Sequence, residues 1–158
     1  MPVVIRKAER RDLESLGRLG AMLMQVHYAF DNQRFLAPHP GVEQGYAAFL
    51  GSRIDSSDEC VFVADVDGRV AGYLFAALEP LSWKELRGPA GYIHDVAVEE
   101  NDRREGIATM LMEAGFRWLR DHGAPRVVLG TAARNEGAQA LFHRLGFRDT
   151  MIEMTKEL

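Results

Sequence analysis

Apolar and polar positions along the first third of the chain predict one strand followed by two helices. Residues Val3–Ala8 form a short apolar run followed by charges, which is typical of a strand leading into a helix capped near Asp12. Apolar residues then recur at helical spacing as far as Tyr28. A loop with two prolines follows, and residues 42–54 are expected to form a second helix.

Asp67-Gly68 gives the clearest local signal in the chain. It separates two β-rich runs at 60–66 and 70–78, and Asp-Gly suits the positive φ angles of a tight hairpin turn. Further strands are expected at 91–98, 126–131 and 149–156, and further helices at 106–122 and 136–145. Strands and helices alternate only in the second half, so the pattern predicts a three-layer α/β domain with a mixed sheet of about six to seven strands and about four helices.

Composition narrows the class of protein. A length of 158 residues with 47% hydrophobic content suits one domain over residues 1–158. The net charge of -4 argues against a nucleic-acid partner, and no apolar run approaches the ~20 residues of a membrane span. Cys60 is the only cysteine and lies in an apolar run, so we expect a buried thiol, no disulfide and a cytoplasmic location; no metal site is predicted.

One segment carries a pattern for binding an anion. Val96-Ala97-Val98 ends a predicted strand, and Arg103-Arg104-Glu105-Gly106-Ile107-Ala108-Thr109 opens a long amphipathic helix. Small residues at Gly106 and Ala108 let a ligand approach main-chain amides that have no intrahelical partner, and the helix dipole is positive there. A diphosphate fits several converging amides, with Arg103, Arg104 or the Thr109 hydroxyl adding hydrogen bonds. Taken alone, the same residues also suit a plain surface turn.

These residues resemble the pyrophosphate motif of the GNAT superfamily of acetyl-CoA-dependent N-acetyltransferases, Gln/Arg-x-x-Gly-x-Gly/Ala. A later segment also resembles the family, with an Asn after a strand and then Ala, Leu, an aromatic residue and Gly-Phe. Its positions here are Asn135, Ala138, Leu141, Phe142, Gly146 and Phe147. The resemblance implies a GNAT-like fold in which strands 91–98 and 126–131 splay apart, with acetyl-CoA as the cofactor.

The resemblance also implies roles for single residues. Main-chain groups of Val96 and Val98, with Ala97 between them, would bind pantetheine in the cleft. Asn135 and Ala138 would lie near pantetheine or phosphate, Phe142 near the thioester, and Arg144 near a phosphate. For Phe142, simple core packing is the alternative.

Acetyl transfer to an amine needs groups that move protons, and here the sequence leaves choices open. Many GNAT members have a tyrosine, thought to protonate the leaving thiolate, where this chain has Phe142. Tyr92 or a water would fill that role, or the thiolate leaves without an acid. His94 is the candidate base, through water, although a structural histidine is an equal alternative. Alternation along the strand places His94 and Asp95 on opposite faces, and Asp95 is expected to have a hydrogen-bonding partner.

The acceptor pocket is expected from the first two helices, their connection and the loop near Trp83. Tyr28, Phe30, Asp31 and Trp83 are the candidate residues, with Asp31 attracting a cationic amine; ordinary helix-end packing and solvated charges are the alternative. The resulting hypothesis is an N-acetyltransferase for a small-molecule or peptide amine. A non-catalytic acyl-CoA-binding sensor and a nucleotide-binding regulatory domain are the alternatives, and a homodimer is compatible with the resemblance.

Overall fold

The protein, described here by a computed structural model over residues 2–158, folds around one five-stranded sheet with the strand order β1-β2-β3-β4-β5. Neighbouring strands are antiparallel except for β4 and β5, which are parallel. The strands are β1 (Val3–Lys7), β2 (Glu59–Val66), β3 (Arg69–Glu79), β4 (Ala90–Val98) and β5 (Val127–Leu129). The helices are α1 (Leu13–Phe30), α2 (Val42–Gly51), α3 (Ile107–Asp121) and α4 (Glu136–Arg144), with short 3₁₀ turns at Arg10–Asp12 and Glu100–Asp102.

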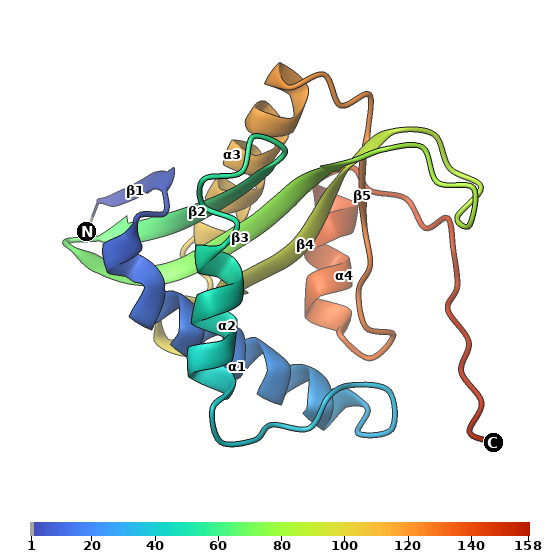
Figure 1. Ribbon diagram of the computed structural model, residues 1–158, viewed down its shortest axis with the longest axis horizontal. Coiled ribbons are helices and arrows are strands. Elements are labelled where there is room, and N and C mark those ends of the chain that lie inside the picture. The colour runs from blue at the N-terminus through green and yellow to red at the C-terminus, as the bar shows by residue number, and fades with distance from the viewer. Residues whose placement is uncertain (1) are drawn as a thin grey trace.

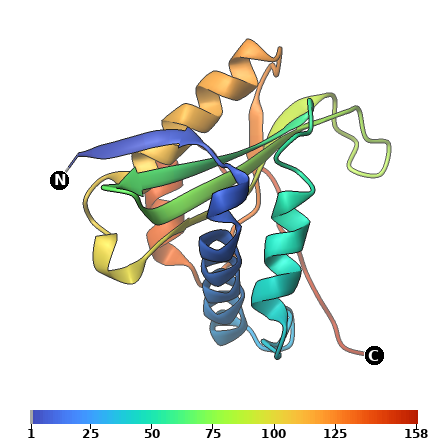
Figure 2. The same ribbon diagram turned by 60° about the vertical axis from the view of Figure 1, so that its left-hand side comes forward.

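The sheet separates two hydrophobic layers, so the predicted three-layer arrangement is confirmed (Figures 1 and 2). On one face, Leu16 and Leu19 of α1 and Leu50 of α2 pack on Tyr73 and Phe75 of β3. On the other face, α3 and α4 cover the alternate strand residues; their core side chains include Leu74, Ile93, Ile107, Leu111, Leu119 and Phe142. Cys60 is buried as expected, and burial raises the pKa of its thiol to about 12.

Turns and caps form where the local sequence predicts them. Asp67 and Gly68 both have positive φ, 52° and 84°, as the β2–β3 hairpin requires. The side-chain oxygen of Asn135 caps α4 by accepting a hydrogen bond from the amide of Ala138 at 3.1 Å. Gly106 and Gly123, with φ of 79° and 87°, stand at the two ends of α3.

Two expectations about the end of the chain are wrong. Residues 149–156, the expected final strand, form no strand, and the sheet of the described residues has five strands rather than six to seven. Strand β5 is also shorter than expected, because only Val127–Leu129 pair with Gly91–Ile93. Figure 1 shows the last residues running beside the β5 end of the molecule without joining the sheet. A strand needs a neighbouring strand for its main-chain groups, and residues 149–156 have none within residues 2–158.

None of the helices in residues 2–158 is both long and apolar enough to cross a membrane.

Candidate active site

A β-bulge in the middle of β4 shapes the site. Ile93 pairs with Ala76 and Asp95 with Phe75, so His94 is an extra residue without a partner on β3. The bulge corrects the expectation that His94 and Asp95 lie on opposite faces. Both side chains line the same hollow, on the face covered by α1 and α2, because the extra residue interrupts the alternation.

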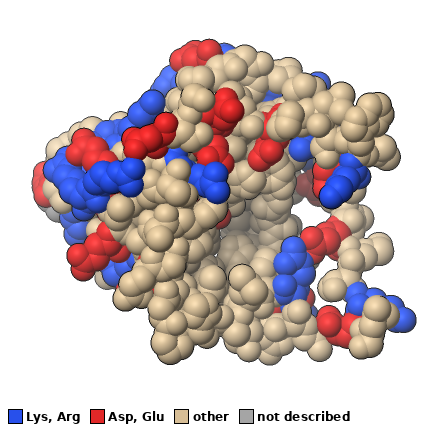
Figure 3. Space-filling model, viewed as in Figure 1, with Lys and Arg blue, Asp and Glu red and all other residues tan. Residues whose placement is uncertain are grey.

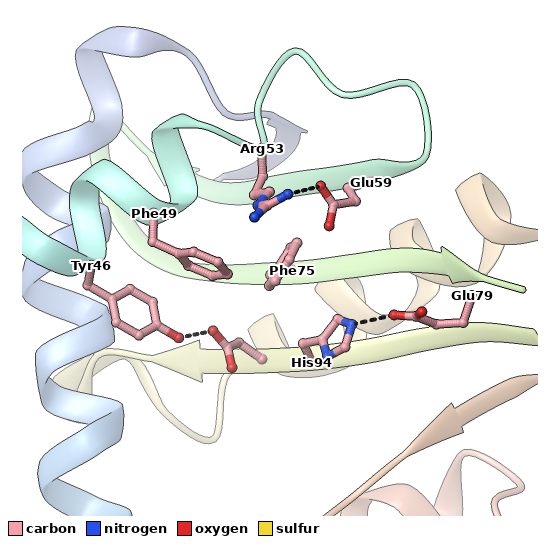
Figure 4. A pocket seen from close by; sticks show the side chains of 8 residues that line it. Tyr46, Phe49, Arg53, Glu59, Phe75, Glu79 and His94 are labelled. Atoms are coloured by element: carbon pink, nitrogen blue, oxygen red, sulfur yellow. Dashed lines mark hydrogen bonds and ion pairs between the residues drawn. The ribbon is translucent and has the colours of Figure 1, made fainter. Parts of the chain in front are cut away.

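The hollow has a volume of about 440 Å³ and lies between α2 and the strands β2, β3 and β4. Its walls combine aromatic rings with three carboxylates and one guanidinium (Figure 4). The lining residues are Tyr46, Phe49, Arg53, Glu59, Phe75, Glu79, His94 and Asp95. Figure 3 shows the same side of the molecule hollowed near its centre, between the positions of α2 and α4.

Asp95 is held by two tyrosine hydroxyls. Tyr46 of α2 and Tyr73 of β3 both donate to its Oδ2, Tyr73 at 2.9 Å. Burial, followed by the charge of Asp95, raises the pKa of Tyr46 and of Tyr73 well above the ordinary value. Both phenols therefore remain protonated donors at neutral pH. The partner expected for Asp95 is present, supplied by two residues that sequence reasoning did not connect with it.

His94 lies in the hollow between two aromatic rings and one carboxylate. Its ring stacks on Phe75 and on Tyr92, with centroid distances of 5.1 and 4.5 Å. Its Nε2 is 3.1 Å from Oε1 of Glu79. In the tautomer that donates this hydrogen to Glu79, Nδ1 keeps its lone pair and can accept a proton. Burial raises the pKa of Tyr92, which keeps its hydroxyl protonated as well.

The start of α3 offers main-chain donors to a ligand. No side chain caps this end of the helix, and a Cβ built at Gly106 would meet no atom within 4 Å. Arg104 also has positive φ, 68°, so the loop changes direction just ahead of the first turn of α3. Arg103 differs from the expectation of a rim arginine, since its Nε donates to the carbonyl of Val98 at 3.1 Å. Ile107 is buried in the core, so only its main chain can face a ligand.

Strand β4 has an unpaired edge between the bulge and this loop. On the β5 side, pairing stops at Ile93, which faces Leu129. Within residues 2–158, Val96, Ala97 and Val98 have strand partners only on β3. The expected divergence of the two parallel strands is therefore present, and beyond Ile93 no strand pairs with β4 on that side.

The second segment that resembles the family, residues 135–147, makes contacts within the protein itself. Asn135 caps α4 with its side-chain oxygen, and Ala138 packs on the core. Phe142 is buried and meets Phe147 edge to face at 5.9 Å, which matches the alternative of core packing. Arg144 is exposed at the end of α4.

The residues expected to hold the acceptor are not brought together. Asp31 accepts hydrogen bonds from the amides of Gln33 and Arg34, and Trp83 is 84% exposed on the β3–β4 loop. Tyr28 and Phe30 are half-buried near the end of α1, and none of the four lines the hollow. Sequence reasoning missed the residues of α2 and of the strand ends that do line it. Glu59 and Glu79, acidic residues at the ends of apolar strands, were the available signal.

Comparison with known proteins gives a family for this chain. Residues 24–147 match the model of the acetyltransferase (GNAT) family. An N-alpha-acetyltransferase from Sulfurisphaera tokodaii is 27% identical over 153 residues, which cover 94% of this chain and 81% of that protein. One from Saccharolobus solfataricus is 34% identical over 99 residues, 58% of each chain. A mycothiol acetyltransferase from Clavibacter sepedonicus is 26% identical, and the match spans 39% of its length.

Solved structures share the whole fold. A mutant of the BH1408 protein from Bacillus halodurans superposes with a TM-score of 0.84 at 24% identity, over 98% of this chain and 99% of that one. The aminoglycoside N-acetyltransferase AAC(6')-Iy, solved with CoA, gives a TM-score of 0.77 at 20% identity, over 99% of this chain and 95% of that chain.

Proposed function

Since the chain belongs to the acetyltransferase (GNAT) family, we propose that it transfers the acetyl group of acetyl-CoA to a primary amine by direct attack in a ternary complex. One observation carries this proposal. The unpaired edge of β4 joins the amide-lined start of α3 at one end to the bulged pair His94 and Asp95 at the other. The proposed diphosphate site and the polar hollow therefore lie at the two ends of one stretch of main chain, the unpaired edge of β4.

The start of α3 suits the pyrophosphate of acetyl-CoA. Open space at Gly106 lets the phosphates reach the first-turn amides, including those of Ile107, Ala108 and Thr109. Arg104 and Glu105 are exposed beside it, and Arg104 can add a charge-assisted hydrogen bond. Arg103 contributes by fixing the loop to Val98. Bound here, acetyl-CoA supplies the thioester carbonyl that the amine attacks.

The pantetheine arm is assigned to the edge of β4 at Val96, Ala97 and Val98. This stretch has no strand partner on the β5 side, and although the Val98 carbonyl accepts from Arg103, an extended amide-bearing chain can pair with the remaining main-chain groups of that edge. Asn135 and Ala138, at the start of α4, are the candidate contacts for the pantetheine or phosphate region. Phe142 supports the helix from the core, and exposed Arg144 is the further candidate for a phosphate contact.

The hollow suits a cationic amine with some apolar character. Three carboxylates line it, from Glu59, Glu79 and Asp95, against the guanidinium of Arg53. Arg53 is already engaged, since it donates to Glu59 at 3.3 Å and lies over the ring of Phe49 at 5.2 Å. The remaining acidic groups attract an ammonium, and the ring of Phe75 offers it an aromatic surface. The names of relatives that act as N-alpha-acetyltransferases support an amine acceptor.

We assign the base to His94. The attacking nitrogen must lose its proton, and the imidazole accepts it directly or through water while Glu79 holds the ring in place. Asp95 has a positioning role, because Tyr46 and Tyr73 already donate to it. Tyr92, whose ring stacks on His94, is the candidate donor for the leaving sulfur. Without that donor a thiolate still leaves readily, since a free thiol has a pKa of only about 8.5.

The decisive experiment measures thiol release from acetyl-CoA against a panel of amines, with acetylated product identified by mass spectrometry. The panel holds peptides with a free α-amino group, the same peptides with blocked N-termini, and small polyamines. We expect release above the hydrolysis rate with at least one amine and none with its blocked form. Tight CoA binding without acetylation of any panel member would instead favour the non-catalytic sensor.

A further inference from the structure

The hollow has two polar sides that face each other across an aromatic ring. Arg53, in the turn after α2, and Glu59, at the start of β2, line one side, and Glu79 and His94 line the other. Figure 4 shows the ring of Phe75 between these two pairs. Strands β2 and β4 flank β3, so their main chains lie about 10 Å apart, two strand spacings. An acceptor amine at His94 therefore leaves room for a second polar group that reaches the opposite side.

Arg53 has hydrogen-bond donors that the protein leaves unused. Within residues 2–158, its guanidinium makes one hydrogen bond, from Nη1 to Glu59 at 3.3 Å, which is longer than the ~2.7–2.9 Å of a strong charged pair. Its Nε is buried without a partner, and no other buried side-chain nitrogen or oxygen of the described residues lacks one. A buried donor without an acceptor is costly, so this guanidinium gains from an acceptor that a ligand brings.

Accessibility decides which charge this side of the hollow presents to a ligand. The side chain of Arg53 is 41% exposed and that of Glu59 is 20% exposed, so a ligand meets the guanidinium before the carboxylate. On the opposite side, the carboxylate of Glu79 is 33% exposed beside Nε2 of His94. The hollow thus offers a carboxylate to an ammonium on one side and a guanidinium to an anion on the other. The planar fork of a guanidinium suits a carboxylate, because it donates two parallel hydrogen bonds.

We propose that the acceptor is a primary amine that also carries a carboxylate several bonds from the nitrogen. The inference rests on the proposed acetyl transfer and names the class of acceptor. The ammonium binds beside Glu79 and His94, the intervening chain lies over the ring of Phe75, and the carboxylate binds Arg53. Arg53 turns from Glu59 toward the ligand, which gives its Nε–H an acceptor. A free ω-amino acid and a peptide with an acidic residue after its free α-amino group share this chemistry.

The test measures ligand binding by calorimetry on the CoA-bound protein. Three ligands of similar length are compared: ε-aminocaproate, its uncharged amide ε-aminocaproamide, and hexamethylenediamine, in which a second ammonium replaces the carboxylate. A second arm compares glycylglutamate with glycylglutamine, both with amidated C-termini. This arm separates a peptide N-terminus from a free amino acid as the source of the carboxylate.

Two variants accompany the wild type. Arg53→Met combined with Glu59→Gln removes one charge of each sign, so the net charge of the hollow stays the same. Arg11→Met is the matched control, because Arg11 also pairs with a glutamate but is 66% exposed and does not line the hollow. Thermal unfolding establishes that each variant is folded.

We expect wild type and Arg11→Met to bind ε-aminocaproate at least about tenfold more tightly than its amide or the diamine, as a hydrogen-bonded charged pair allows. The double variant should show no preference over the amide. A preference in the dipeptide arm alone identifies a peptide as the acceptor. Equal affinities in both arms of the wild type, tighter binding of the diamine, or a preference that survives in the double variant overturns the proposal.

Thiol release with the same amines separates this inference from the acetyl transfer on which it rests. Binding that depends on Arg53, without acetylation of any amine, contradicts acetyl transfer and leaves the carboxylate site in place. Acetylation at the same rate with and without the carboxylate, together with equal affinities, contradicts the carboxylate site alone.

Discussion

Arg6 joins two carboxylates that are distant in sequence and so fixes the start of the sheet to the start of α1. Its guanidinium donates to both oxygens of Asp12, at 2.8 and 3.0 Å, and to Asp65 at 3.0 Å. Asp12 is only 4% exposed and is the buried charged residue of the described chain. Burial by itself raises the pKa of Asp12, but the hydrogen bonds from Arg6 and from the amide of Glu9 outweigh it and lower the pKa below its usual range.

Arg6→Met should cost about 3 kcal/mol of unfolding free energy at pH 7, because a buried carboxylate loses its charged partner. A carboxyl group with a lowered folded-state pKa stabilises the fold above its unfolded value of about 3.9, and this contribution is lost as pH falls through the folded value. The difference between wild type and variant should therefore shrink in acid, where Asp12 becomes neutral. Urea unfolding at pH 7 and at a series of pH values below the unfolded-state value of about 3.9 measures this.

Arg11→Met is the matched control for Arg6→Met. Arg11 pairs with Glu9 at 2.7 Å, but both side chains are more than half exposed. Exposed pairs contribute at most about 1 kcal/mol, so this variant should unfold close to wild type at each pH. Equal losses in the two variants would contradict a special role for the buried pair.

His94→Ala should lower kcat by about 10²-fold or more, as loss of a general base does. The effect on CoA binding should be much smaller. CoA affinity should stay near wild type, because the proposed phosphate site lies at the start of α3. His143→Ala is the control, since His143 also pairs with a carboxylate but lies on α4 outside the hollow. Steady-state kinetics with calorimetry of CoA separates the two effects. Wild-type kcat in folded His94→Ala would remove His94 from the reaction.

At the scale of elements, two glycines of α1 set how closely α2 approaches. A Cβ at Gly17 would lie 2.3 Å from the carbonyl oxygen of Glu43, and a Cβ at Gly20 would lie 2.1 Å from the ring of Tyr46. Close approach of the helices therefore seats Tyr46 against Asp95. The hollow depends in this way on small residues that do not line it.

Gly20→Ala should destabilise the fold by about 1–3 kcal/mol, as overpacking does, and should also lower turnover because Tyr46 must move from Asp95. Gly45→Ala, in α2 with open space at its Cβ, should instead raise stability by up to about 1 kcal/mol through helix propensity and leave turnover unchanged. Thermal unfolding and thiol release check both variants. An unchanged rate in Gly20→Ala would show that the Tyr46–Asp95 contact is not needed for activity.

The two ends of α3 allow a matched test of the phosphate site. Gly106→Trp should weaken CoA binding by at least about tenfold, or ~1.4 kcal/mol, because the side chain fills the approach to the first-turn amides. Gly123→Trp introduces the same residue at a similar positive φ beyond the other end of the helix, also with open space at its Cβ. Calorimetry should give Gly123→Trp the same CoA affinity as wild type. Equal affinity in the two variants would place the pyrophosphate elsewhere.

At the scale of the whole molecule, the family and the fold were predictable from local patterns. The hairpin at Asp67-Gly68, the strand–loop–helix segment around Gly106 and the Asn135 segment each depend on neighbouring residues, and the predictions of a GNAT fold and of an acetyltransferase that uses acetyl-CoA are confirmed. The acceptor amine and the site residues stay predictions. Cytoplasmic location and a single domain stay predictions as well.

The features that the sequence did not predict depend on contacts between segments that are distant in the chain, and the periodicity of apolar residues does not encode such contacts. The bulge at His94 cannot be seen in an apolar strand, so alternation misplaced Asp95. Tyr46 reaches Asp95 only after α2 packs over the sheet, and Tyr73 only after β3 pairs with β4. The wrong final strand at 149–156 has the right residues but no strand neighbour within residues 2–158. Long-range packing, rather than local preference, decided these features.

The brief pairing of β5 with β4 has a consequence for how the chain unfolds. Three residue pairs join these strands, so β5 and everything after it are attached to the sheet mainly by the apolar underside of α4. A segment attached so sparingly forms its own cooperative unit and detaches before the β1–β4 meander melts. A ligand bound across β4 and β5 would hold that unit to the β1–β4 meander. Its binding would therefore raise the free energy needed to detach the unit.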